Sequence, residues 1–455
     1  MKVCITGQHE TELDSDVYIA SVRGAGRKEF IMRVDFSDLT PLLSSLDVDI
    51  ANIAAGLFKY EGLFRNQDIR LDGELTVVLC QSKLTKSRQL ADAISDIVSF
   101  TLHSRPRVNL HKSAERCATG PGEGTHKLSS VCLFSGGIDS LSGILKTPPA
   151  LMPTAGVFVS HDRMASLVRH MQEKILNKEE IPIHKIGIQR GHLGYQQMRG
   201  FTYLVMGAVV AKIHKTDNII ISETGQTMFL PPMGALDEIT MTTHPTLIEI
   251  TKSLLRESYG IEFKIYEPFS DLTKAEVVSL CNAKGEISST NSCITTRFAN
   301  QEYSHCGKCF GCLVRRIGCL VAGVNDARYA KDVLAAPVGS PVMGGWPGKT
   351  IRAEDLADLQ ALLRLTRDVI EDKLDETARF KISSFSKEDL FRRASMDVLA
   401  ALHIMYDQTR RGHSDSVRRF YEECKKDKLI NLDIAQDRIG KVREAKYKPD
   451  FENFL

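Results

Sequence analysis

A serine- and glycine-rich segment, residues 135–140, has the residue types of a phosphate-binding loop. It follows the apolar run 131–134, which predicts a strand, and a helix is expected to begin near its end. Glycines let backbone N–H groups approach an anion, and a helix start adds free N–H donors. An aspartate repels phosphate unless a metal or an adenylate hydroxyl intervenes, so its presence here suggests Mg²⁺ at the pyrophosphate. The alternative is a turn in which Asp and Ser only cap the helix. The expected ATP-binding residues are Ser135, Gly136, Gly137, Ile138, Asp139 and Ser140.

Four cysteines in the second half of the chain have the spacing of a metal site. They are Cys293, Cys306, Cys309 and Cys312, the last three in a C-x2-C-x2-C pattern. Thiolates so spaced can turn toward one centre, and zinc accepts four sulfurs without leaving an open position. We therefore expect a structural Zn²⁺, with an iron–sulfur cluster as the alternative. It would hold the loop 292–316 over the phosphate site, where three arginines could meet phosphate or carboxylate. These are Arg297, Arg315 and Arg316. The other seven cysteines are interpreted as core or incidental.

Composition restricts the class of protein. The 455 residues are too many for one ordinary core, so two or three domains are expected. The net charge of +2 argues against a general nucleic-acid or membrane-surface protein. No apolar run reaches the roughly 18 residues of a membrane span. We expect a cytoplasmic protein without a membrane partner or direct nucleic-acid binding.

Three regions differ in their patterning. Residues 1–125 contain short strand-like runs and an amphipathic helix at 90–102, which predict an α+β domain. Residues 126–324 alternate strand and helix patterns, which predicts an α/β domain with a doubly wound parallel sheet. Residues 325–455 carry apolar residues at helical spacing, which predicts a helical domain. The strands expected in the middle region are 131–134, 156–160, 185–189, 218–222 and 263–266.

The sequence resembles a known enzyme family at several places. The string 135–140 resembles the PP-loop ATP pyrophosphatases, which cleave ATP between the α and β phosphates and transfer AMP to an acceptor oxygen. Together with the cysteine segment 306–315, it resembles the QueC family of 7-cyano-7-deazaguanine synthases. Residues 267–269 and 273–277 resemble that family's late strand–helix segment. There a lysine commonly reaches the ATP phosphates, so the resemblance implies that Lys274 acts with Asp139 in catalysis.

The resemblance also implies a substrate side. The family's P-x-R-N segment corresponds here to residues 197–201, which keep an arginine, Arg199, but not the asparagine. Glu223 and Gln226 follow the expected strand 218–222, where the base should lie at the carboxyl end of the sheet. With Arg297 from the cysteine loop, these residues are the expected contacts to a deazaguanine-type small molecule.

The regions outside the resemblance suggest a changed reaction. The architecture resembles the enlarged QueC-like proteins of bacterial anti-phage operons, of the Qat and type IV CBASS kind. That resemblance implies a carboxylate–amine ligase, which adenylates a 7-deazaguanine carboxylate and joins it by an amide bond to the amino terminus of a protein encoded nearby.

Three alternatives remain open. One is an authentic nitrile-forming synthase of queuosine biosynthesis, and another is a tRNA-thiolating PP-loop enzyme, which would need a catalytic cysteine pair and a basic face. The third is a nucleotide-sensing scaffold that binds ATP without turnover. The expected cofactors of the ligase are ATP, Mg²⁺ and Zn²⁺.

Overall fold

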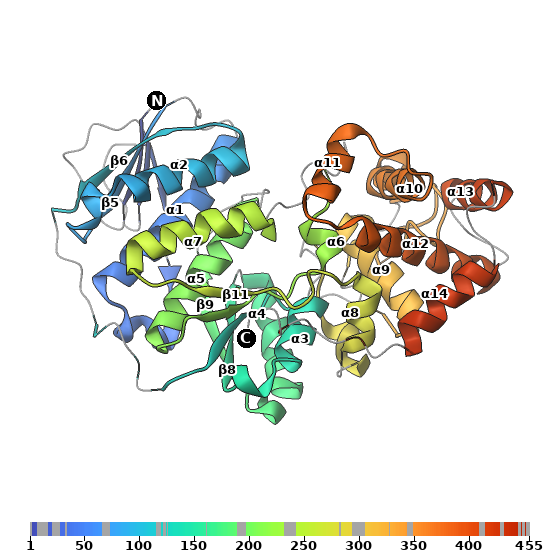
Figure 1. Cartoon of the computed structure of the whole chain (residues 1–455), viewed down its shortest axis with the longest axis horizontal. Helices are drawn as coiled ribbons and strands as arrows, with labels where there is room; N and C mark the ends of the chain where they lie inside the picture. Colours follow the sequence, from blue (N-terminus) through green and yellow to red (C-terminus); the bar gives the residue numbers. More distant parts are fainter. Residues whose placement is uncertain are drawn as a thin grey trace.

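Two sheets and a layer of C-terminal helices make up the described part of the chain (Figure 1). The computed structural model describes residues 2–6, 17–20, 28–31, 34–65, 73–114, 120–121, 124, 126–160, 162–188, 197–231, 243–281, 284–293, 305–326, 328–343, 349–408, 415–427, 432–444, 447 and 451. Residues 118–125, whose three glycines and one proline predict a linker, lie mostly outside the described residues. No described helix is long and apolar enough to cross a membrane.

The first sheet is formed by the N-terminal region. Its order is β3-β2-β1-β5-β6, and every pairing is parallel. The strands are β1 (Lys2–Thr6), β2 (Val17–Ala20), β3 (Lys28–Ile31), β5 (Glu74–Leu79) and β6 (Arg107–Lys112), and the helices are α1 (Ser45–Arg65) and α2 (Arg88–Leu102). The expected α+β architecture is therefore wrong, because every pairing is parallel and α2 connects β5 to β6, which makes this region α/β. α1 is buried on nearly all sides, so it lacks the amphipathic period that would have revealed it.

The second sheet has the order β11-β10-β7-β8-β9-β4 and is parallel except for its β4 edge. Its strands are β4 (Val34–Asp35), β7 (Ser130–Leu133), β8 (Thr154–Ser160), β9 (Ile183–Ile188), β10 (Asn218–Ile220) and β11 (Lys264–Tyr266). The five strands expected in the middle region are all present. The chain runs outward from β7 first through β8 and β9, then on the other side through β10 and β11. This reversal places a ligand crevice at the carboxyl ends of β7 and β10.

Helices cover both faces of the second sheet. They are α3 (Ile138–Leu145), α4 (Asp162–Lys174), α5 (Arg199–Ile213), the short α6 (Gly225–Met228), α7 (Pro245–Tyr259) and α8 (Lys274–Leu280). Alternate residues of β7 face different apolar cores: Val131 and Leu133 pack toward the N-terminal region, and Cys132 packs toward the C-terminal helices. In the first of these cores α1 packs on α5 and α2 on α7, so both sheets share it.

The C-terminal region is helical, as expected. It comprises α10 (Ala357–Ile370), α11 (Glu376–Ser384), α12 (Glu388–Gln408), α13 (Asp415–Lys426) and α14 (Leu432–Glu444), which follow α9 (Phe310–Ala322). Figure 1 shows these helices gathered on the side of α8 and α9, away from the N-terminal sheet. α12 packs against α9, α10 and α14, and α14 also contacts α8. Short 3-10 helices lie at Ser37–Leu42, Leu84–Lys86, Pro149–Leu151, Leu176–Glu179, Lys284–Ser289 and Ala353–Leu356.

Replacing Gly225 with alanine should loosen the junction between the second sheet and the C-terminal helices. A Cβ at this position would lie 1.9 Å from the carbonyl oxygen of Ser270 and 2.7 Å from Leu390 on α12. Because backbone cannot move aside cheaply, we expect a loss of about 1–3 kcal/mol in the free energy of unfolding, measured by urea denaturation. Gly440→Ala on α14, where a Cβ meets nothing within 4 Å, is the matched control. Equal midpoints for the two variants would contradict this account of the junction.

Candidate active site

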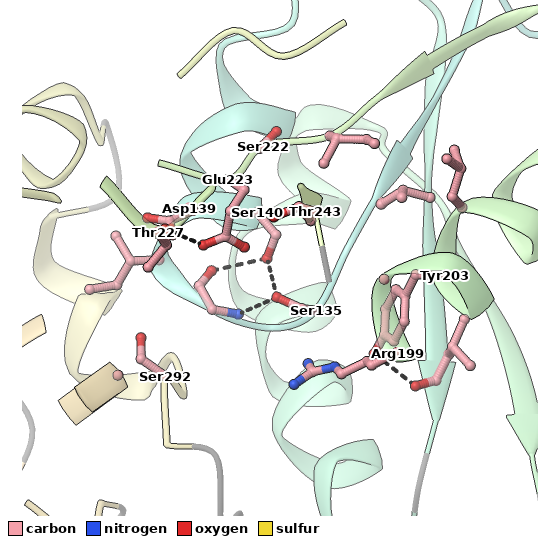
Figure 2. Close-up of a pocket in the computed structure, with 18 of the residues that line it drawn as sticks. Ser135, Asp139, Ser140, Arg199, Tyr203, Ser222, Glu223, Thr227, Thr243 and Ser292 are labelled. Atoms are coloured by element: carbon pink, nitrogen blue, oxygen red, sulfur yellow. Dashed lines mark hydrogen bonds between the residues drawn. The ribbon is translucent and has the colours of Figure 1, made fainter. Parts of the chain in front are cut away.

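The segment 135–140 forms a tight turn between β7 and α3. Gly136 has a φ of 80°, a conformation that favours glycine, and Gly137 is the N-cap of α3. The N–H of Gly137 donates to Ser135 Oγ (3.4 Å), and Ser135 Oγ lies 3.3 Å from Ser140 Oγ (Figure 2). Ser140 Oγ in turn donates to the Gly137 carbonyl oxygen (3.1 Å). Two hydroxyls and a helix amino terminus therefore face one cavity, which suits an anion.

A buried ion pair lies beside this turn. Lys274 Nζ contacts Asp139 Oδ2, and both side chains are about nine-tenths buried. Lys274 is the first residue of α8, and its N–H donates to Gln226 Oε1 (2.8 Å). Asp139 Oδ1 is buried and has no hydrogen-bond partner among the described residues. An unsatisfied carboxylate oxygen in such a place is costly, and it is a ligand that a hard cation prefers. The expected Mg²⁺ fits here.

The cavity wall also carries Arg199 and Glu223. Arg199 is the first residue of α5, and its guanidinium carbon lies 5.4 Å from the ring centre of Tyr203. Glu223 follows β10 and accepts a hydrogen bond from Thr227 Oγ1 (2.7 Å). Burial raises the pKa of the Glu223 carboxyl, and the neighbouring Asp139 carboxylate raises it further. Figure 2 shows both residues arranged with Ser135 and Ser140 around the same cavity.

One expected substrate contact does not line the cavity, and another cannot be placed because it lies outside the described residues. The side chain of Gln226 is bonded to the backbone of Lys274, and Gln226 does not belong to the described residues that line the cavity. It holds the start of α8 instead. Arg297 lies outside the described residues. Of the other arginines near the cysteines, Arg315 is fully buried and paired with the carboxylate of Asp326 (2.8 Å), and it does not line the cavity.

Sequence reasoning missed two parts of the cavity wall. One is α7, which contributes Leu247 and Thr251 among other residues. Its apolar residues recur at helical spacing after the N-cap His244, so the pattern was present in the sequence. The other is Asn291, whose N–H donates to the Gly136 carbonyl oxygen (2.9 Å). No motif points to this asparagine.

The amide of Asn291 is oriented toward a donor role. Its Oδ1 accepts the N–H of Cys293 (2.6 Å), so its Nδ2 is the donor end. That nitrogen is buried and has no hydrogen-bond partner among the described residues, although Asn291 lines the cavity. Asn291 thus connects the cysteine segment to the turn at residues 135–140, called the phosphate-type turn below. Its free amide N–H can serve as a donor for a ligand.

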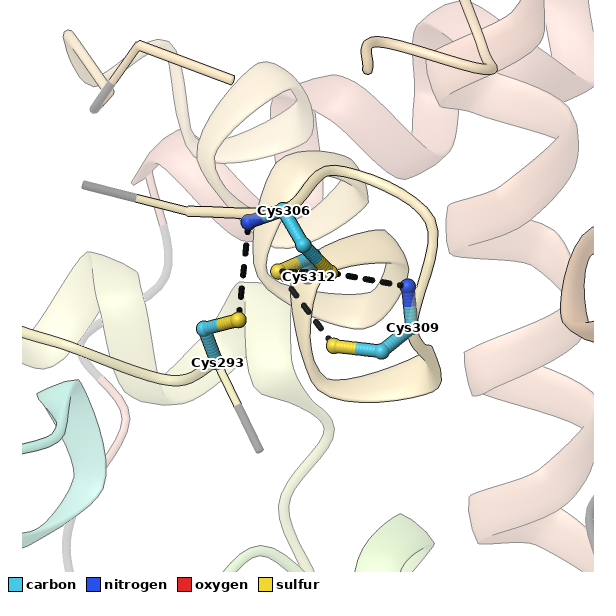
Figure 3. Close-up of side chains that lie close together, drawn as sticks. All are labelled: Cys293, Cys306, Cys309 and Cys312. Atoms are coloured by element: carbon cyan, nitrogen blue, oxygen red, sulfur yellow. Dashed lines mark hydrogen bonds between the residues drawn. The ribbon is translucent and has the colours of Figure 1, made fainter. Parts of the chain in front are cut away.

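The four predicted metal ligands lie together. Their sulfur atoms are all within 4.8 Å of one another, and all four residues are buried (Figure 3). Cys312 Sγ is 3.4 Å from Cys309 Sγ and 3.8 Å from Cys306 Sγ. Zn–S bonds of about 2.3 Å in a tetrahedron place sulfurs roughly 3.8 Å apart. The backbone N–H groups of Cys306 and Cys309 also point at thiolates, each 3.4 Å from a sulfur. This cluster fits zinc.

The remaining cysteines differ among themselves. The buried cysteines that form no disulfide are Cys4, Cys132, Cys281, Cys319 and Cys424, which agrees with core positions. Cys80 is disulfide-bonded, so its interpretation as incidental is wrong. Cys117 lies outside the described residues.

Replacing Cys309 with serine should release the metal. We expect the purified wild type to carry about one zinc per chain and the variant to have lost most of it, with a lower unfolding temperature. Metal content is read by mass spectrometry. Cys424→Ser, which changes a buried cysteine on α13, should keep its zinc. Iron and sulfide in the wild type would instead establish the iron–sulfur alternative.

Comparison with known proteins gives two matches. Residues 150–323 match the family model described as queuosine biosynthesis protein QueC. A 74-residue stretch is 38% identical to the 7-cyano-7-deazaguanine synthase of Thiobacillus denitrificans, which covers 16% of this chain and 32% of that relative. The chain therefore spans about a third of the length of the curated relative it matches. The family match includes Arg199, Glu223, Lys274 and the four cysteines, and it begins after the phosphate-type turn. Residues 150–323 are QueC-like.

Proposed function

We propose that this protein is an ATP-dependent ligase of the PP-loop type that adenylates a 7-deazaguanine carboxylate and transfers it to an amine. The observation that carries the proposal is the single cavity in which the phosphate-type turn, the buried Lys274–Asp139 pair and the QueC-like wall meet. The name of the relative, 7-cyano-7-deazaguanine synthase, indicates a 7-deazaguanine. Adenylation is argued from the chemistry of the cavity, and the acceptor from the regions outside the family match.

The turn and its neighbours would hold the triphosphate. Ser135, Ser140 and the Asn291 amide supply donors, and Lys274 supplies a positive charge. Asp139 would hold Mg²⁺ through its unpaired oxygen, and the ion would neutralise charge on the departing pyrophosphate. The substrate carboxylate attacks the α phosphorus, the bond to pyrophosphate breaks, and an acyl adenylate results. The protein contributes position and charge in this step and no covalent nucleophile.

Arg199 and Glu223 would hold the deazaguanine ring and its carboxylate. Arg199 is suited to the substrate carboxylate, because a guanidinium pairs with carboxylates in two parallel hydrogen bonds. Glu223, with its raised pKa, is suited to the N–H and carbonyl edge of a purine-like ring. In the second step an amine nitrogen attacks the acyl carbon, the bond to AMP breaks, and the amine loses a proton as the amide forms.

The identity of the amine acceptor is the part of the proposal that goes furthest beyond the family match. The family match leaves residues 1–149 and 324–455 outside it, and we propose that these flanks recognise a partner protein whose amino terminus is the acceptor in anti-phage defence. Ammonia as acceptor, followed by dehydration to a nitrile, is the alternative. A scaffold that binds ATP without turnover is the second alternative.

Replacing Lys274 with methionine should abolish adenylation. We expect the rate of pyrophosphate release from ATP, in the presence of 7-carboxy-7-deazaguanine, to fall at least about a hundredfold, since transition-state charge loses its counterion. The matched control is Lys264→Met on β11, an exposed lysine that lies outside the cavity. It should keep the wild-type rate. Pyrophosphate release by Lys274→Met at the wild-type rate would exclude the proposed role of this lysine.

Intact-mass measurement separates the acceptors. The wild type is incubated with ATP, Mg²⁺, the deazaguanine carboxylate and the protein encoded beside it. We expect the partner protein to gain the mass of the 7-deazaguanine carboxylic acid less one water. A nitrile formed with ammonia and an unmodified partner would establish the synthase, and the absence of pyrophosphate would favour the scaffold.

A further inference from the structure

The first turn of α8, which carries Lys274, is fixed by a carboxylate. Thr273 Oγ1 accepts the N–H of Glu276 (3.4 Å), and Glu276 Oε2 accepts the N–H of Thr273 (2.9 Å). This reciprocal capping box defines where the helix begins. Glu276 is fully buried. A buried carboxylate is stable only when cations and donors surround it, so the position of this turn depends on what lies opposite Glu276.

The C-terminal helices supply those cations. Arg438 of α14 contacts Glu276 Oε1 through Nη2 (2.8 Å) and Asp397 of α12 through Nε (2.7 Å). Arg393 of α12 pairs with the other oxygen of Glu276. Both arginines lie outside the QueC match. The positive charges that balance Glu276, two residues after Lys274, therefore come from the region outside the family match.

The side chain of Lys274 has little other freedom. A Cβ on Gly318 of α9 would lie 2.8 Å from Lys274 Cγ, so α9 already confines the stem of the lysine. Its N–H is held by Gln226. With the stem enclosed, a shift of the helix start moves the ammonium group with it.

A carboxylate from the N-terminal region acts in the same way on the other wall. Glu61 of α1, also fully buried, accepts the N–H groups of Gln197 (2.8 Å) and Met198 (2.9 Å). These are the two residues directly before Arg199. Glu61 lies outside the QueC match as well. It accepts hydrogen bonds from backbone N–H groups that have no partner within α5, and so fixes the start of α5, where Arg199 is the first residue.

We propose that the two flanks are positioning parts of the active site: Arg438, with Arg393, sets Lys274 for ATP, and Glu61 sets Arg199 for the carboxylate. This rests on the proposed roles of Lys274 and Arg199. It assigns to each flank a task in the chemistry besides any recognition of a partner. The C-terminal flank then affects the use of ATP, and the N-terminal flank affects the binding of the carboxylate substrate.

The test is a split between two Michaelis constants in the full-length protein. Arg438→Met should raise the KM for ATP or lower kcat/KM for ATP by roughly ten- to a hundredfold, with the KM for 7-carboxy-7-deazaguanine little changed. Glu61→Gln should raise the KM for the carboxylate and leave that for ATP near the wild-type value. Arg438→Lys, which keeps the charge, should recover part of the loss.

The matched control is Arg443→Met. Arg443 also lies on α14, where it donates to the carbonyl oxygens of Val321 (3.0 Å) and Leu320 (3.3 Å) and so docks the same helix on α9. It should lower the unfolding temperature without changing either KM. If Arg438→Met and Arg443→Met have equal kinetics at equal stability, the positioning role is excluded.

Calorimetric titration with Mg·ATP separates this inference from the proposed function. A wild type that binds Mg·ATP but releases no pyrophosphate would overturn the proposed activity. In that case weaker binding by Arg438→Met than by Arg443→Met still supports the positioning role, and equal binding overturns it. Should Arg438→Met fail to fold, Arg438→Lys and Glu276→Gln are measured in its place.

Discussion

The contact between Lys274 and Asp139 is the interaction on which the rest of the cavity depends. Both groups are almost removed from water, and removing one partner of such a pair leaves an uncompensated charge that costs about 3–5 kcal/mol. The pair joins α3 to α8, and its two residues lie 135 positions apart in the chain. It can form because β7, β10 and β11 are parallel, so that the helix after β7 and the helix after β11 start at the same edge of the sheet.

The cysteine cluster serves the same cavity from another side. Cys293 lines the cavity, and the segment before it reaches the turn through the Asn291 N–H and the Gly136 carbonyl oxygen. A metal held by these four sulfurs would have no open position for a substrate or water, so its contribution would be to fix this segment. The binding energy of the metal would thereby help to place a donor beside the phosphate-type turn.

The middle sheet and the turn could be predicted from the sequence because their information is local. Strands buried on both faces read as apolar runs, and a left-handed turn position needs glycine, as at Gly136. The four cysteines were predictable since metal geometry restricts their spacing. The parallel N-terminal sheet was not, because α1 is buried on nearly all sides and has no polar stripe.

Charged residues were the least predictable part of the site. A pattern-based interpretation treats an arginine as a surface residue, yet Arg315 is fully buried. Its partners Thr290 and Asp326 come from different segments. Arg438 meets Glu276 across 162 residues of sequence. No local pattern carries such a pairing, because burial of a charge is decided by a partner that only the folded chain brings near. For the same reason Gln226 was expected at the base and instead bonds to the start of α8.

Interactions cross both of the predicted region boundaries, and some of them hold residues next to the cavity. The boundaries predicted at residues 125 and 324 mark changes in patterning. Among the described contacts that cross them, β4 pairs with β9, Glu61 holds the start of α5, and Arg438 pairs with Glu276. Removing either flank would take from a fully buried carboxylate, Glu61 or Glu276, groups that it bonds to across the boundary. The QueC-like region, 150–323, is a unit of resemblance, whereas the unit that places charge in the cavity includes both flanks.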